Sequence, residues 1–170
     1  TLDGMYLRLA EELSAAHSTG EVFPVYPLLH RISLEAIARV MFGEESPVRV
    51  REGVEAIHGF IFSFSSPLMM FLKPLQVDLG PWSPWGRAVR ARARLRTLCQ
   101  TQLDLARSDQ ATTGIIADIA RRAAGVTDSS LITEVLTLLM FGHDTAATTM
   151  AWAMGHIHQN REIALRARRE

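Results

Sequence analysis

Apolar side chains recur at intervals of three and four residues along most of the chain, which is the spacing of one face of an α-helix. Gly43 and Gly125 follow two of these segments, and Ser46-Pro47 precedes another, as is typical of helix ends and starts. Alternation with a period of two, which would indicate strands, is weak throughout. The pattern predicts helices over residues 3–17, 27–42, 47–64, 85–107, 115–123, 129–159 and 161–170. We therefore predict an all-α fold with one long central helix, at about 129–159.

Residues 65–84 depart from the helical pattern. This segment contains four prolines, which interrupt helices, yet it remains rich in large apolar side chains such as Leu68, Met69 and Phe71. We expect a loop here. A loop this apolar either packs against the protein or contacts a ligand.

The composition favours a well-buried globular protein and argues against several classes of function. Of the 170 residues, 48% are hydrophobic and 21% are charged, so a disordered tail is excluded. Lys+Arg and Asp+Glu are 18 each, and a net charge of zero argues against general attraction to nucleic acid or to a membrane surface. No apolar run approaches the ~20 residues of a membrane span. We predict one helical unit over residues 1–170, and the missing initial methionine suggests a fragment.

Cysteine is represented by Cys99 alone. No intrachain disulfide can form, which fits a reducing cytoplasm, and zinc sites that need paired cysteines are excluded. Cys99 shares the apolar face of its predicted helix with Leu95 and Ala106, which indicates a buried structural cysteine rather than a reactive one.

The long predicted helix breaks local rules at 141–152, FGHDTAATTMAW. Gly142 weakens a helix by about 1 kcal/mol relative to alanine. Asp144 and Thr145 are polar in an otherwise apolar stretch, and an acid next to a hydroxyl can relay a proton. Thr145 can also bond back to the carbonyl of Phe141. An alternative interpretation remains open, in which Asp144 bonds a neighbouring helix and the threonines only pack.

Residues 141–146, FGHDTA, resemble the central helix of the cytochrome P-450 family, the haem-thiolate monooxygenases. That family's motif is Ala or Gly, Gly, any residue, Asp or Glu, Thr, and Thr or Ser. Gly142, Asp144 and Thr145 match it, whereas Phe141 and Ala146 depart from it. The stretches RISLEAIARVMFG at 31–43 and REIALRARRE at 161–170 also resemble helices of the family, and the resemblance covers essentially the whole chain.

The resemblance implies a bacterial-type, cytoplasmic enzyme that uses haem b, dioxygen and a redox partner (a ferredoxin or a reductase) to hydroxylate an apolar small molecule. It implies that Asp144 and Thr145 deliver protons and that Gly142 leaves room for dioxygen. The implied haem contacts are Leu138, Phe141, Gly142 and Thr149, and the implied substrate contacts are Leu68, Met69, Phe71 and Phe141. The family's haem-ligating cysteine loop has no counterpart in this span, so we expect the chain alone to be inactive.

Three further hypotheses follow from the same residues. A truncated relative could be a non-catalytic helical module that binds a ligand or partner, and exposed apolar faces would favour self-association or pairing with a missing C-terminal half. A DNA-binding protein is disfavoured by the charge balance. We expect no metal site, because His156 and His158 point about 200° apart on a helix and His143 lies almost opposite Thr145.

Overall fold

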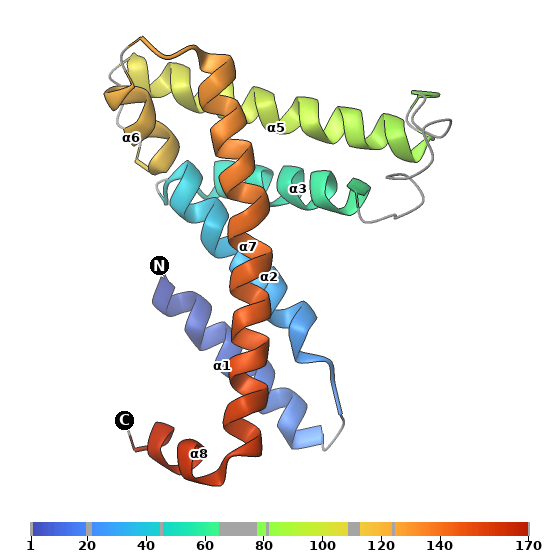
Figure 1. The fold of residues 1–170 in the computed structure, drawn as a ribbon, viewed down its shortest axis with the longest axis vertical. Helices are drawn as coiled ribbons and strands as arrows, with labels where there is room; N and C mark the ends of the chain where they lie inside the picture. Colours follow the sequence, from blue (N-terminus) through green and yellow to red (C-terminus); the bar gives the residue numbers. More distant parts are fainter. Residues whose placement is uncertain are drawn as a thin grey trace. The chain divides into compact units, whose positions relative to one another are not determined.

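The computed structural model describes residues 2–19, 22–44, 46–64, 78–80, 82–108, 113–123 and 125–169. Every regular element within these ranges is an α-helix, so the predicted all-α fold is confirmed. The helices are α1 (Leu2–Thr19), α2 (Val25–Phe42), α3 (Pro47–Phe64), α5 (Pro84–Arg107), α6 (Ile115–Arg122), α7 (Asp128–Gln159) and α8 (Arg161–Ala167) (Figure 1). Their bounds agree with the sequence prediction to within three residues, and the long central helix is α7.

The chain forms two compact units. The terminal unit consists of Thr1–Ser33 together with Phe141–Glu170, and the middle unit consists of Leu34–Met140. Helices α2 and α7 each contribute one part to each unit.

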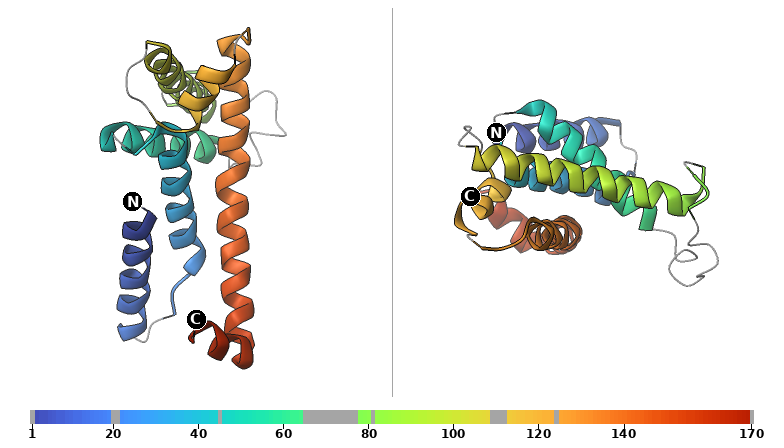
Figure 2. Two further views of the ribbon diagram at one scale, coloured as in Figure 1. Left: turned by 90° about the vertical axis from the view of Figure 1, so that its left-hand side faces the viewer. Right: turned by 90° about the horizontal axis from the view of Figure 1, so that it is seen from above.

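In the middle unit, α5 lies along α3, and α6 packs against α5 (Figures 1 and 2). The sequence predicted that one face of α5 would be buried, and the structure confirms it, since Leu95, Cys99 and Ala106 are at most 4% exposed. Large side chains from α2, α3 and α7 complete this core, and each one buried contributes about 1.5–3 kcal/mol. Fully buried examples are Phe42, Ile57, Leu103, Ile116, Leu131, Val135 and Leu139.

The predicted helix start at Ser46-Pro47 has the expected chemistry, and the start of α5 shares it. The Ser46 hydroxyl accepts a hydrogen bond from the Arg49 amide at 3.3 Å before α3. Ser83 caps α5 in the same way, accepting from the Gly86 amide at 3.0 Å, with proline in the first turn. Serine satisfies an amide that has no partner within the helix, while proline there loses nothing because its missing N–H would have been unpaired.

A buried glutamine and a glycine fix the segment before α6 against the end of α2. The Gln102 side chain, 1% exposed, donates to the carbonyl oxygens of Phe42 at 3.1 Å and Thr113 at 3.4 Å. Gly114 has a φ of 102°, and a Cβ there would lie 2.6 Å from the Met41 carbonyl oxygen. Only glycine permits both this backbone conformation and this close approach.

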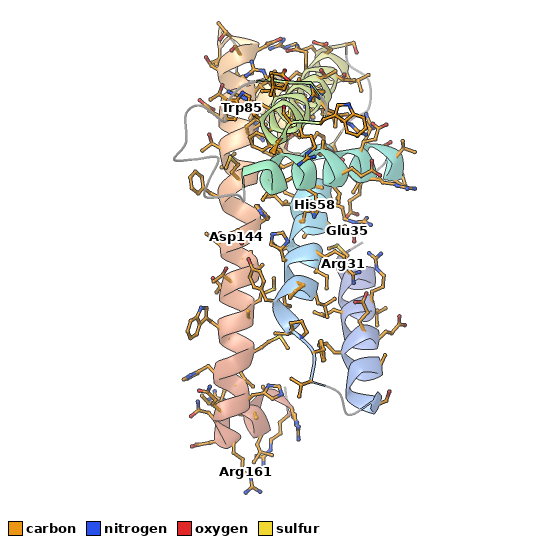
Figure 3. The ribbon with its side chains drawn as sticks, turned by 90° about the vertical axis from the view of Figure 1, so that its right-hand side faces the viewer. Arg31, Glu35, His58, Trp85, Asp144 and Arg161 are labelled. Carbon is orange, nitrogen blue, oxygen red and sulfur yellow. The ribbon has the colours of Figure 1, made fainter. Side chains whose placement is uncertain are left out.

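The terminal unit contains α1, the first part of α2, the second part of α7, and α8. Arg31 of α2 forms an ion pair with Glu12 of α1 at 2.5 Å. Figure 3 shows Arg31 on α2 and Asp144 on α7. The most buried side chains of this unit include Met5, Leu29 and Ala147, at 3%, 1% and 0% exposure. Across the described parts of both units, none of the helices has the length and apolarity needed to cross a membrane.

Candidate functional site

The candidate motif lies on α7, which is α-helical through Gly142 and Thr145. The Thr145 hydroxyl donates to the Phe141 carbonyl oxygen at 2.5 Å, as the sequence analysis allowed. Thr149 donates in turn to the Thr145 carbonyl oxygen at 2.8 Å. These bonds to the carbonyl four residues earlier let a helix hold hydroxyl groups in an apolar stretch. The hydroxyl of Thr145 is therefore anchored to the backbone rather than to another side chain.

The face of α7 that carries Thr145 is open within the terminal unit. Phe141 is 68% exposed, and Gly142, Thr145 and Thr149 are also exposed. In the middle unit, Leu138 is 48% exposed on the same helix. Large apolar side chains that are exposed to solvent in this way indicate a surface that binds a ligand or another part of a protein. The predicted haem contacts are thus accessible, while the predicted substrate contacts Leu68, Met69 and Phe71 lie outside the described residues.

Asp144 is turned toward α2 rather than toward the open face. The Tyr26 hydroxyl donates to Asp144 Oδ1 at 2.5 Å, although the two residues are 118 positions apart in the sequence. This bond to the carboxylate, followed by desolvation, raises the pKa of Tyr26 above its usual value of 10.0. The contact is the one expected if Asp144 bonds a neighbouring helix. It also holds an exposed carboxylate in a fixed orientation one residue before Thr145.

Two histidines lie beside this pair. His143 is 2% exposed, and its carbonyl oxygen accepts a hydrogen bond from Ser33 at 2.7 Å. Its ring meets the ring of His30 edge to face at a centroid distance of 5.1 Å. One ligand atom from each of His30, His143 and Asp144 lies within 4.8 Å of the others.

Sequence reasoning missed the partners of Asp144 and His143 on α2. Tyr26, His30 and Ser33 follow one another at intervals of four and three residues, which places them on one helix face. This row of polar side chains beside the apolar face of α2 was the sequence feature that could have indicated a polar contact with another helix. It did not show which helix the row would meet, because the partners are distant in the sequence.

Cys99 does not belong to this site. It is 0% exposed in the core of the middle unit, as the sequence predicted. Burial is the main cause that raises the pKa of its thiol from 9.0 to about 12. A neutral, enclosed thiol is a poor metal ligand, because the thiolate is the form that binds metal.

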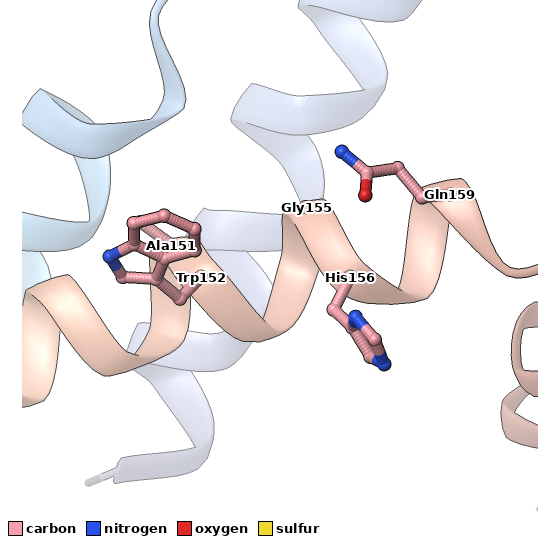
Figure 4. Close-up of a pocket in the computed structure, with 5 residues that line it drawn as sticks. All are labelled: Ala151, Trp152, Gly155, His156 and Gln159. Carbon is pink, nitrogen blue, oxygen red and sulfur yellow. The ribbon is translucent and has the colours of Figure 1, made fainter.

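A small pocket lies on the last turns of α7. Its lining comes from Ala151, Trp152, Gly155, His156 and Gln159 (Figure 4). Trp152 is 77% exposed there. The pocket holds no cluster of polar groups comparable to that around Asp144, and none of its lining residues was predicted as a site residue.

Comparison with known proteins identifies the family to which this sequence is similar. A family profile described as Cytochrome P450 matches residues 2–170. "Putative cytochrome P450 138" of Mycobacterium tuberculosis is 29% identical over 153 residues, covering 85% of this chain and 34% of that protein. "Putative cytochrome P450 135B1" of the same organism is 26% identical over 167 residues, covering 84% of this chain and 32% of that protein.

A fungal relative, "Cytochrome P450 monooxygenase ALT8" of Alternaria alternata, is 27% identical over 146 residues, covering 75% of this chain and 24% of that protein. The chain spans about a third of the length of the mycobacterial relatives. No solved structure gave a significant match. Because the family profile matches nearly the whole chain, the resemblance found in the sequence is confirmed, and the chain belongs to the cytochrome P450 family.

Proposed function

We propose that this chain forms the central-helix region of a haem-dependent monooxygenase that activates dioxygen to hydroxylate an apolar small molecule. The observation that carries the proposal is the open face of α7, where Gly142 and the Thr145 hydroxyl are exposed beside Phe141. A flat apolar cofactor needs such a face, and family membership supports haem as that cofactor. The electrons would come from a ferredoxin or a reductase, and the free thiol of Cys99 fits a cytoplasmic location.

The residues of α7 suit contact with haem b. Phe141 and Leu138 supply exposed apolar surface, Gly142 supplies a gap, and Thr149 has its hydroxyl already bonded to the backbone. Haem held by a cysteine thiolate would supply the chemistry that activates dioxygen. We assign that thiolate to a cysteine outside residues 1–170, because Cys99 is enclosed and protonated. Leu68, Met69, Phe71 and Phe141 remain the proposed substrate contacts.

Asp144 and Thr145 are proposed to move protons to the open face of α7. Adjacent helical residues point about 100° apart, so Thr145 lies on the open face while Asp144 points toward α2, where it remains exposed to solvent. Asp144 would take up a proton from solvent at a carboxylate oxygen and return it through water to the Thr145 hydroxyl oxygen, as that hydroxyl releases its own proton toward the open face. For this transfer the Thr145 hydroxyl must exchange its bond to the Phe141 carbonyl oxygen for a bond to a water molecule. Tyr26 keeps the carboxylate oriented between transfers.

The test is the coupling of electron use to product formation in the haem-loaded full-length enzyme. Thr145→Ala removes the hydroxyl that passes the proton, so a larger share of the electrons should end as peroxide, with little change in substrate affinity. General acid–base groups typically contribute about 10²–10⁴-fold to a rate, so coupling should fall severalfold at least.

Thr137→Ala is the matched control. Thr137 lies on the same helix, is exposed, and makes the same bond to the carbonyl four residues earlier, at 2.9 Å. It should leave coupling unchanged. Equal coupling in Thr145→Ala and wild type would remove Thr145 from the mechanism.

A second candidate is a non-catalytic module that binds a ligand or a partner through the same helix. The exposed Phe141 and Trp152 favour it, at 68% and 77% exposure, because large apolar side chains are costly to leave in water. This alternative predicts that the full-length protein binds no haem. It also predicts tight binding of an apolar ligand or partner that is lost in Phe141→Ala and Trp152→Ala.

A further inference from the structure

The contact between α2 and α7 within the terminal unit brings together three side chains that can bind a metal ion, and one of them, Asp144, is also the proposed proton carrier. We propose that His30, His143 and Asp144 form a binding site for a divalent transition-metal ion of the zinc class. His30 lies on α2, whereas His143 and Asp144 are consecutive residues of α7. Their ligand atoms lie within 4.8 Å of one another, on three side chains that are half-buried, buried and exposed respectively.

The distances suit a small ion after a modest adjustment. Zinc binds imidazole nitrogen and carboxylate oxygen at about 2.0–2.2 Å in a tetrahedral arrangement, which separates neighbouring ligand atoms by roughly 3.4 Å. The ligand atoms lie within 4.8 Å of one another, so pairs of them must approach by up to roughly 1.4 Å. His143 is held in place by burial, so the movement falls to the side chains of His30 and Asp144, which have more room.

Two hydrogen bonds hold the ligands in place, and the first of them acts on a ligand side chain as outer partners do at known metal sites. Tyr26 donates to Asp144 Oδ1, which fixes the direction of the carboxylate and leaves its other oxygen available to a metal ion. Ser33 donates to the His143 carbonyl oxygen and ties that turn of α7 to α2. Residues that orient metal ligands in this manner typically affect metal affinity by about 10–100-fold.

The donor set selects the class of ion. Two imidazoles and one carboxylate match zinc and related transition metals, whereas calcium and magnesium require mostly oxygen ligands. Three protein ligands leave a fourth position for water. Because Asp144 is exposed, the ion and its water can enter from that side.

The same side chains could simply hold the two helices together, with the histidine rings edge to face and the carboxylate bonded to Tyr26. The two possibilities differ in one measurable property, which is stoichiometric binding of zinc that depends on His30. No titration or catalytic step enters this distinction.

Zinc binding is measured on the full-length protein after treatment with a chelator. Equilibrium dialysis against zinc chloride, with zinc and iron counted separately, gives the stoichiometry and the dissociation constant. X-ray absorption at the zinc edge then reports the ligand atoms. We expect one zinc per chain with nitrogen and oxygen ligands. We also expect affinity at least about tenfold weaker in His30→Ala and Asp144→Asn, and about tenfold weaker in Tyr26→Phe.

His156→Ala is the matched control, because it removes an exposed histidine from the same helix outside the cluster. It should leave the affinity unchanged. Absence of a stoichiometric site overturns the proposal, as does zinc binding that survives both His30→Ala and Asp144→Asn or that is lost equally in the control. Circular dichroism confirms that each variant remains folded. Asp144 belongs to both proposals, but dialysis measures bound zinc and the experiment on Thr145 measures electron use, so either proposal can fail alone.

Discussion

The pKa and the burial of Cys99 determine whether its thiol can ionise to a thiolate, and they give a quantitative prediction. Burial raises the pKa of its thiol from 9.0 to about 12. Each pKa unit changes the thiolate fraction tenfold at a pH below both values, so the native protein should hold about a thousandfold less Cys99 thiolate than the unfolded chain. The side chain is also 0% exposed, which further limits access.

Alkylation with iodoacetamide measures this difference directly, since the thiolate is the form that reacts. Trypsin releases Cys99 in the peptide 97–107, so mass spectrometry follows this residue alone even beside other cysteines. The native rate should be lower than the rate in denaturant by a factor of about 10³ or more. A native rate within about tenfold of the unfolded rate would show that Cys99 is accessible and ionised, and would reopen its exclusion as a haem ligand.

Two further predictions concern the middle unit. Gly114→Ala should lower the free energy of unfolding by more than about 3 kcal/mol, because a clash with backbone atoms adds to the cost of a strained φ of 102°. Gly125→Ala, at a similar φ of 84° but with open space around it, should cost only about 1–2 kcal/mol, and equal losses in urea denaturation would contradict the close approach. The hydrogen bond from Arg107, and then that from Gln100, hold the pKa of Asp128 below its usual value of 3.8. The stability contributed by this contact is therefore present above pH 3.8 and is lost as the pH falls through the lowered pKa. An NMR titration of the Asp128 carboxyl should have its midpoint below 3.8 in wild type and closer to 3.8 in Arg107→Gln, whereas identical midpoints would refute the pairing.

The helices were predictable because their signals are local. The apolar periodicity of residues 129–159 and the absence of proline after residue 84 were enough to predict α7. Ser46-Pro47 predicted the start of α3, since capping depends on residues three positions apart. The burial of Cys99 followed from its helix face in the same way.

The surroundings of the candidate site were only partly predictable. The motif around Thr145 identified the family, and the bond to the Phe141 carbonyl follows from helix geometry alone. The contacts of Asp144 and His143 depend on which face of α2 meets α7, and no local pattern encodes that choice. This is why the local pattern did not indicate that His30 lies next to His143.

The most direct test of the proposed function is the haem ligation of the full-length protein, in wild type and in Cys99→Ala. Both proteins should bind one haem per chain, and the reduced carbon monoxide complex of both should give the Soret band of a thiolate-ligated haem. A protein that binds no haem would contradict the proposed function. A folded Cys99→Ala variant that loses the thiolate band would show that the ligand is Cys99 after all.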